Sequence, residues 1–173
     1  MNSDQITARF GSYHVEVLQQ DTNRRLASLN SSHTDGAVCR TLAVTQFYQP
    51  IPTALESVDR DIRKGKSIGA TMRSAGLQIH KQILVRLSAR CGSTFAELSN
   101  QTVASGTLLH VCLYRLSAGA SEANFESYAT IAEAHHPEHI PPRPDDPEAS
   151  TATLDHLDQD SSAALQALLT ALT

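Results

Sequence analysis

The stretch from Leu77 to Ala89 places the strongest constraint on the fold of this chain. Apolar side chains recur at every second position from Ile79 to Leu87, which is typical of a β-strand with one covered face. Lys81 interrupts this apolar side, and we expect its aliphatic stem to lie near a sheet edge with the ammonium group in water. The chain therefore contains a sheet.

Partner strands are predicted by alternation and by β-branched residues elsewhere in the chain. They lie in the second half of Ile6 to Gln19, at Arg25 to Leu29, Val38 to Tyr48, Leu108 to Leu116, and Phe125 to His135. Loops are expected at Ser31 to Gly36 and at Ser117 to Asn124. Helices are expected at Ala54 to Lys64, Ile68 to Ala75, Phe95 to Asn100, and in a final run that ends near Leu172.

Strands that follow one another through a turn outnumber strands that are joined through a helix. The pattern predicts an α+β fold, with a mainly antiparallel sheet of five or six strands and helices packed on one face. This layout, with its late hairpin that ends before Pro137, is similar to chorismate-lyase-like and related effector-binding folds. The similarity lies in the order of elements, so it assigns no function to any residue.

The composition divides the chain into three parts. Residues 1–136 form a single α+β domain, and residues 137–152 form an acidic tether that contains five of the seven prolines. Residues 153–173 form an amphipathic C-terminal helix. Its leucines must be buried against the sheet of the same chain, a second copy, or another protein.

Charge is segregated along the chain, although the net charge is only −4. Met1 to Asp59 carries −2, Arg60 to Arg90 carries +7, and Cys91 to Thr173 carries −9. The basic part includes a Gly65-Lys66-Ser67 joint at which a new helix begins, and free N–H groups at a helix start favour anions. The alternative is that this part faces the chain's own acidic residues.

The sequence thus predicts a site for an anionic small molecule or an acidic protein segment. The expected ligand-binding residues are Lys64, Lys66, Ser67, Gly69, Thr71, His80, Arg86 and His110. A nucleotide-hydrolysing P-loop is excluded, because Arg60 stands where that motif requires a glycine. An ordinary corner between two helices is the other interpretation of this joint.

A second prediction concerns the sheet face opposite the apolar one, which gathers polar residues. They are His14, Glu16, His80, Arg86, His110, Cys112, Tyr114, and also Glu133 with His135. Histidines, an arginine and carboxylates on one surface suit acid-base chemistry, which is the basis for a small lyase-like enzyme as an alternative function. A face open to solvent would have the same composition.

Other classes of function are disfavoured. Metal-ligand residue types cluster between Glu133 and His139, but Pro137 prevents the helix on which His135 and His139 would converge, so we expect no metal site. The acidic chain has no tryptophan and no aromatic residue from Arg60 to Arg90, so nucleic acid is an unlikely partner. No sequence pattern indicates a cofactor.

The expected location is the cytoplasm. Three widely spaced cysteines indicate a reducing compartment, and no apolar run is long enough to span a membrane. A further alternative function is an interaction or oligomerisation protein, in which the C-terminal helix docks on a second copy or a protein partner.

Overall fold

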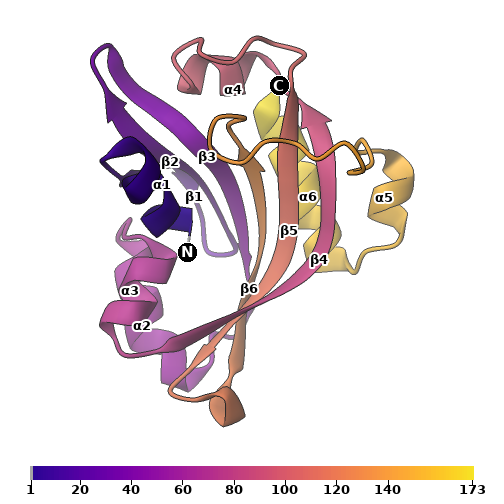
Figure 1. Cartoon of the computed structure of the whole chain (residues 1–173). Helices are drawn as coiled ribbons and strands as arrows, with labels where there is room; N and C mark the ends of the chain where they lie inside the picture. The colour runs from indigo at the N-terminus through magenta and orange to yellow at the C-terminus, as the bar shows by residue number, and fades with distance from the viewer. Residues whose placement is uncertain (1) are drawn as a thin grey trace.

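The computed structural model, which describes residues 2–173, is built on a six-stranded antiparallel sheet with the strand order β1-β2-β3-β6-β5-β4 (Figure 1). The predicted α+β class and the antiparallel sheet are confirmed. The strands are β1 (His14–Gln20), β2 (Arg24–His33), β3 (Gly36–Phe47), β4 (Gln78–Arg90), β5 (Leu108–Gly119) and β6 (Glu126–His135). The α-helices are α1 (Asn2–Phe10), α2 (Glu56–Arg63), α3 (Ile68–Ser74), α4 (Ser93–Leu98), α5 (Thr151–Asp155) and α6 (Gln159–Leu172), with short 3-10 turns at Thr53–Leu55 and Glu122–Asn124.

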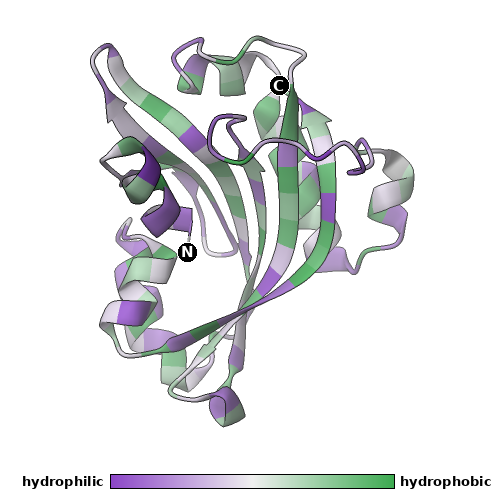
Figure 2. Ribbon diagram, in the orientation of Figure 1, coloured by the Kyte–Doolittle hydropathy of each residue, from purple (hydrophilic) through white to green (hydrophobic). Residues whose placement is uncertain are grey.

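The C-terminal helix α6 covers one face of the sheet. Its side chains Leu165, Leu168 and Leu172 are buried in a core with Val111 and Leu113 of β5. Polar and apolar residues alternate along the central strands (Figure 2), so one side of each strand faces α6. The sequence left three possible docking surfaces for this helix: its own sheet, a second copy, or another protein. In the structure the helix packs on its own sheet.

The opposite face of the sheet is covered by α1, α2 and α3 (Figure 1). Ile62 of α2 and Met72 of α3 pack on Phe47, Leu116 and Tyr128 in a second apolar cluster. Helices therefore lie on both faces, whereas the sequence predicted one covered face. The reason is visible in β3 and β6, the two central strands, whose residues are buried on both sides along most of their length.

A bulge in β4 changes which residues face the second cluster. The pairing with β5 shifts between Ile83 and Val85, so the alternation of faces restarts there. Lys81 and Ile83 precede the shift and face α1 and α3, and Arg86 follows it and faces the same way. The simple alternation assumed from the sequence therefore holds only on each side of the bulge.

The amino-terminal part differs from the prediction. Residues 2–10 form α1, for which the sequence predicted no helix. Ile6 is completely buried and Asn2 and Ser3 are buried polar residues, so tertiary contacts hold this polar helix in place. The predicted loop at Ser31 to Gly36 is mostly strand, because β2 continues to His33 and pairs with β3.

The proline-rich segment that follows β6 is anchored along the edge of the sheet. The Ser88 N–H donates to the Pro147 carbonyl, and the Ala149 N–H donates to the Ser88 carbonyl. Arg90 also pairs with Glu148 at 2.8 Å. The segment is largely exposed, as its composition predicts, but it is not extended throughout: it turns after His136 and again after Arg143, where the Asp146 N–H donates to the Arg143 carbonyl. In residues 2–173 no helix has both the length and the apolar character required to cross a membrane.

Replacing Leu168 by alanine should lower the free energy of unfolding by about 2–5 kcal/mol, because the change leaves a cavity between α6 and the sheet. Leu169→Ala is the matched control, since Leu169 is on the same helix but only partly buried. Urea unfolding followed by circular dichroism measures both. Equal losses for the two variants would show that α6 does not pack as described.

Candidate ligand-binding cleft

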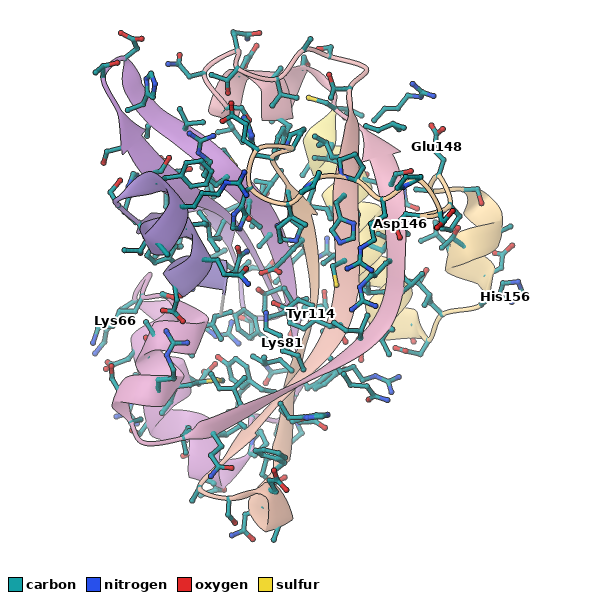
Figure 3. All side chains as sticks on the ribbon, in the orientation of Figure 1. Lys66, Lys81, Tyr114, Asp146, Glu148 and His156 are labelled. Atoms are coloured by element: carbon teal, nitrogen blue, oxygen red, sulfur yellow. The ribbon has the colours of Figure 1, made fainter. Side chains whose placement is uncertain are left out.

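A cleft of about 500 Å³ opens on the sheet face that carries α1. It is bounded by β4, β5 and β6, by the first turn of α1, and by the proline-rich segment. Its polar and charged lining consists of Asn2, Gln5, Lys81, Arg86, His110, Cys112, Tyr114, Glu133, His135 and Arg143. In Figure 3 the labelled Lys81 and Tyr114 lie on the inner side of the sheet, toward α1 and α3.

Strand register brings the polar groups of the cleft together. Glu133 of β6 is directly opposite Cys112 of β5, and His135 is opposite His110. Because residues directly opposite in an antiparallel pair have neighbouring side chains, the two histidine rings stack with centroids 5.7 Å apart. Two neighbouring strands, β5 and β6, thus place a carboxylate and two imidazoles in adjacent rows of one surface.

Glu133 is a buried carboxylate surrounded by donors and by a cation. Asn2 donates from Nδ2 to Oε1 over 3.4 Å, and the Tyr114 hydroxyl is a second donor. The Lys81 ammonium lies 4.1 Å from the centroid of the Tyr114 ring. Burial would raise the pKa of Glu133, but the charge of Lys81 and these hydrogen bonds together hold that pKa below its ordinary value. Glu133 is therefore an anion at neutral pH.

Tyr114 complements this carboxylate as a neutral phenol. Burial, followed by the negative charge of Glu133, raises the pKa of Tyr114 well above its ordinary value. Its proton is consequently retained and available for a hydrogen bond. Burial likewise raises the pKa of the neighbouring Cys112 thiol to about 11, so Cys112 is not a thiolate at neutral pH and lacks the reactivity of a nucleophile.

The two histidines of the cleft have different partners. His110 Nδ1 is 2.8 Å from Asp146 Oδ2, and both side chains are buried. His135 Nδ1 is 3.0 Å from the Thr41 hydroxyl, and burial lowers the pKa of His135 to about 3. His110 is therefore oriented by a carboxylate from the proline-rich segment, while His135 is a neutral member of a hydrogen-bonded row.

The cations of the cleft differ from most others in the chain because they lack a salt bridge. In residues 2–173, neither Arg86 nor Arg143 forms an ion pair. The paired cations are Arg40 with Glu138, Arg63 with Asp59, Lys64 and Lys66 with Asp61, Arg73 with Asp4, Arg90 with Glu148, and Arg115 with Asp158. Lys81 lies beside the Glu133 carboxylate, whereas Arg86 and Arg143, both exposed to solvent, give the cleft positive charge that no carboxylate of residues 2–173 pairs with.

A smaller inner cavity of about 60 Å³ adjoins the cleft beneath α1 and α3. Asn2, Lys81, Tyr114 and Glu133 line both spaces, so these side chains mark the junction. Beyond them the inner cavity has apolar walls from β1, β2, β3 and β6, including Val15, Leu29 and Ile131, and polar groups from Tyr13, Arg25 and Ser67.

The predicted ligand-binding residues are distributed over several surfaces. Arg86 and His110 line the cleft, and Ser67 and Gly69 line the inner cavity. Lys66 and Thr71 lie in a separate groove between α2 and α3, and Figure 3 shows Lys66 on the outer side of these helices. Lys64 and Lys66 both pair with Asp61, at 3.3 and 2.9 Å, so the structure does not bring them to the cleft.

Three residues expected on the histidine-bearing face lie elsewhere. The bulge in β4 turns His80 away from the cleft, and its ring stacks on Phe125. His14 and Glu16 contact Asn30 on the side of β1 opposite Val15, which faces the inner cavity. Six of the nine predicted residues do share one surface: Arg86, His110, Cys112, Tyr114, Glu133 and His135.

Other residues of the cavities were not among the predicted ligand-binding residues, although the strand that carries Lys81 and Arg86 was expected beside the site. The position of Lys81 could have indicated a role in the site, because a lysine in the apolar row of a strand is unusual. In the structure its ammonium group lies beside the Tyr114 ring. Asn2 and Arg143 come from segments without a periodic pattern and reach the cleft only through tertiary packing. Arg25 was placed on a strand but gave no indication of burial.

The sequence matches no protein-family model, and no curated protein is similar to it. The site therefore has to be interpreted from its own geometry. Within residues 2–173, no group of three or more histidine, cysteine or acidic side chains is arranged to hold a metal ion.

Acid should destabilise the protein through its buried histidines. Burial lowers the pKa of His135 to about 3 and that of His136 to about 4, and it also lowers the pKa of His139. Between these values and about 6.5, the unfolded chain binds more protons than the folded chain, so stability falls as the pH falls. Each such histidine contributes a slope of about 1.4 kcal/mol per pH unit within that window.

Urea unfolding from pH 7.5 to 5 should show this loss of stability. In the His135→Gln variant one histidine no longer contributes, so the free energy of unfolding should change less steeply with pH, by about 1.4 kcal/mol per pH unit. The exposed His156→Gln is the control and should leave the slope unchanged. If the stability of the His135→Gln variant depended on pH as steeply as that of the unaltered protein, His135 would not be held neutral by burial.

Proposed function

We propose that this protein binds a small organic anion in the cleft formed by β4, β5, β6 and α1. The observation that carries the proposal is that Arg86 and Arg143, which form no ion pair within residues 2–173, line the same cleft as Lys81. Arginine presents a planar fork of donors that suits a carboxylate or a phosphate. A ligand anion would supply the counter-charge that the chain itself does not provide there.

The cleft also favours an organic ligand over a simple inorganic ion. Ile79, Ile83 and Ile140 contribute apolar surface beside the charged groups, and a volume of about 500 Å³ is within the range of small-molecule sites. Charged groups beside apolar walls would orient a molecule that has an acidic end and a hydrocarbon body. An acidic protein segment is the less suitable ligand, because the adjoining inner cavity admits only a small group.

Thermal unfolding with millimolar carboxylates tests this proposal. Small aliphatic acids and benzoate should raise the melting temperature of the unaltered protein, because ligands that bind only the folded state stabilise it. The double variant Arg86→Gln with Arg143→Gln should lose most of that increase. Lys64→Gln with Lys66→Gln is the matched control, because it removes the same charge outside the cleft.

If the control pair lost the response and the cleft pair retained it, the anion site would be at the joint between α2 and α3. If no carboxylate or phosphate changed the melting temperature of the unaltered protein, the proposed function would be wrong.

A second candidate function is proton-transfer catalysis on the bound acid, as expected for a lyase-like enzyme. The observation that favours it is the buried pair of His110 and Asp146. With Nδ1 held by the carboxylate, Nε2 is the ring atom that can exchange a proton with a ligand in the cleft. Glu133 and Tyr114 would supply an anion and a neutral donor beside the same ligand.

Incubation with a panel of 2-oxo and unsaturated carboxylic acids in deuterated water, followed by proton NMR, tests this candidate. We expect exchange of a C–H proton adjacent to the carbonyl or double bond for deuterium from the solvent, and a loss of at least about 100-fold in rate with His110→Asn. Asp146→Asn should retain ligand binding and lose rate. No reaction with any acid that binds would favour a binding protein over an enzyme.

The alternative function, in which the C-terminal helix α6 docks on a second copy or a protein partner, has less support. The leucines that suggested it are buried against the chain's own sheet, and the exposed side of α6 shows no feature that identifies a partner.

A further inference from the structure

Arg25 is a buried guanidinium group in the wall of the inner cavity. It comes from β2, and 2% of its surface is exposed. Its NH1 donates to the carbonyl oxygens of Ile62 and Lys66, at 3.3 and 2.8 Å. Its Nε has no hydrogen-bond partner, although a buried donor without a partner is costly.

The charge of Arg25 also lacks a counter-ion. None of the ion pairs in residues 2–173 includes Arg25, and the nearby ionisable side chains are the phenols Tyr13 and Tyr128 and the like-charged Arg63. The Ile62 carbonyl, in the last turn of α2, offsets part of this charge, because it belongs to the negative end of the helix dipole. A buried cation is usually paired with a carboxylate, and here the paired group is missing from the chain.

The inner cavity has the size and position for that missing group. Its volume of about 60 Å³ exceeds what a single water molecule requires, which leaves room for a carboxylate on a short stem. The Ser3 hydroxyl, which is also buried and without a partner, lines the same space. Lys81 and Tyr114 belong to both spaces, so a ligand in the cleft can extend past them into the inner cavity.

We propose that the inner cavity is a second anion subsite, and that the ligand is a dicarboxylate with one acid group at Arg25 and the other near Arg86 and Arg143. This inference rests on the proposed function, since it requires an organic anion in the cleft. The apolar walls of the inner cavity fit the hydrocarbon stem that joins the two acid groups. Lys81 at the junction offsets the negative charge of Glu133 along the path of the stem.

Paired acids of equal carbon number test the proposal by isothermal titration calorimetry. Glutarate, adipate and suberate are compared with pentanoate, hexanoate and octanoate. At least one dicarboxylate should bind about tenfold or more tightly than its matched monocarboxylate, because a hydrogen-bonded ion pair at a buried arginine is strong. With Arg25→Gln, which retains amide donors without the charge, the advantage should disappear while monocarboxylates still bind.

Further measurements separate the possible outcomes. Arg86→Gln, in contrast to Arg25→Gln, should weaken both classes of acid. If Arg25→Gln does not fold, the Nε–Hε resonance of Arg25 in the unaltered protein provides the readout, and the dicarboxylate should shift it more than the monocarboxylate does.

Equal affinities for matched acids in the unaltered protein would overturn the dicarboxylate proposal and leave the proposed function intact. If the Arg25→Gln variant melted at a lower temperature but still bound the dicarboxylate more tightly than the matched monocarboxylate, Arg25 would only stabilise the end of α2 and would not bind the ligand. An absence of binding by every acid would reject the proposed function together with this inference.

Discussion

The structure depends on how one central strand accommodates charge. β6 is buried on both faces from Tyr128 to His135, yet it carries Glu133 in the middle of that buried length. A buried carboxylate is stable as an anion only when donors and an opposite charge surround it. Asn2, Tyr114 and Lys81 provide these groups, and they come from a helix and two other strands. This requirement couples α1 to the sheet.

These polar groups lie on the inner face between an apolar cluster and a second polar contact. On one side lies the cluster of α2 and α3, in which Ile62 and Met72 are fully buried. On the other side, the His110–Asp146 pair joins β5 to the proline-rich segment. The cleft lies where neither the helices nor that segment covers the sheet. Its unpaired arginines are thus placed at a part of this face that is accessible to a ligand.

Much of the fold followed from local patterns, and the errors have identifiable causes. Alternation located β4, β5 and β6, because the two sides of each strand carry side chains of different character, although in β4 the alternation restarts at the bulge. The N-terminal helix was missed, since α1 has few apolar residues and is held by contacts of Asn2 and Ile6 with distant strands. The continuation of β2 through Ser31 was missed because serine-rich sequence is typical of loops, whereas pairing with β3 overrides that preference here.

Local sequence patterns predicted only part of the site. The sequence identified Arg86, His110, Tyr114, Glu133 and His135 as members of one face, since alternation within each strand determines which residues share a side. It misplaced His80, because a bulge in β4 depends on pairing with β5 and has no marker such as a glycine. It also emphasised Lys64 and Lys66, which are close in sequence to Asp61 and are neutralised by it.

The sequence by itself determined the class of fold, the approximate strands and most helices, because hydrophobic period and turn residues act over short distances. It also determined that positive charge would be concentrated in the middle of the chain. Only the tertiary structure decided which of those cations lack a partner, since some pair with a nearby acid, as Lys64 does with Asp61, and others with a residue far away in sequence, as Arg90 does with Glu148. The burial of Arg25 beside a cavity, and the meeting of Asn2, Lys81 and Glu133 at its entrance, are likewise products of packing between distant segments.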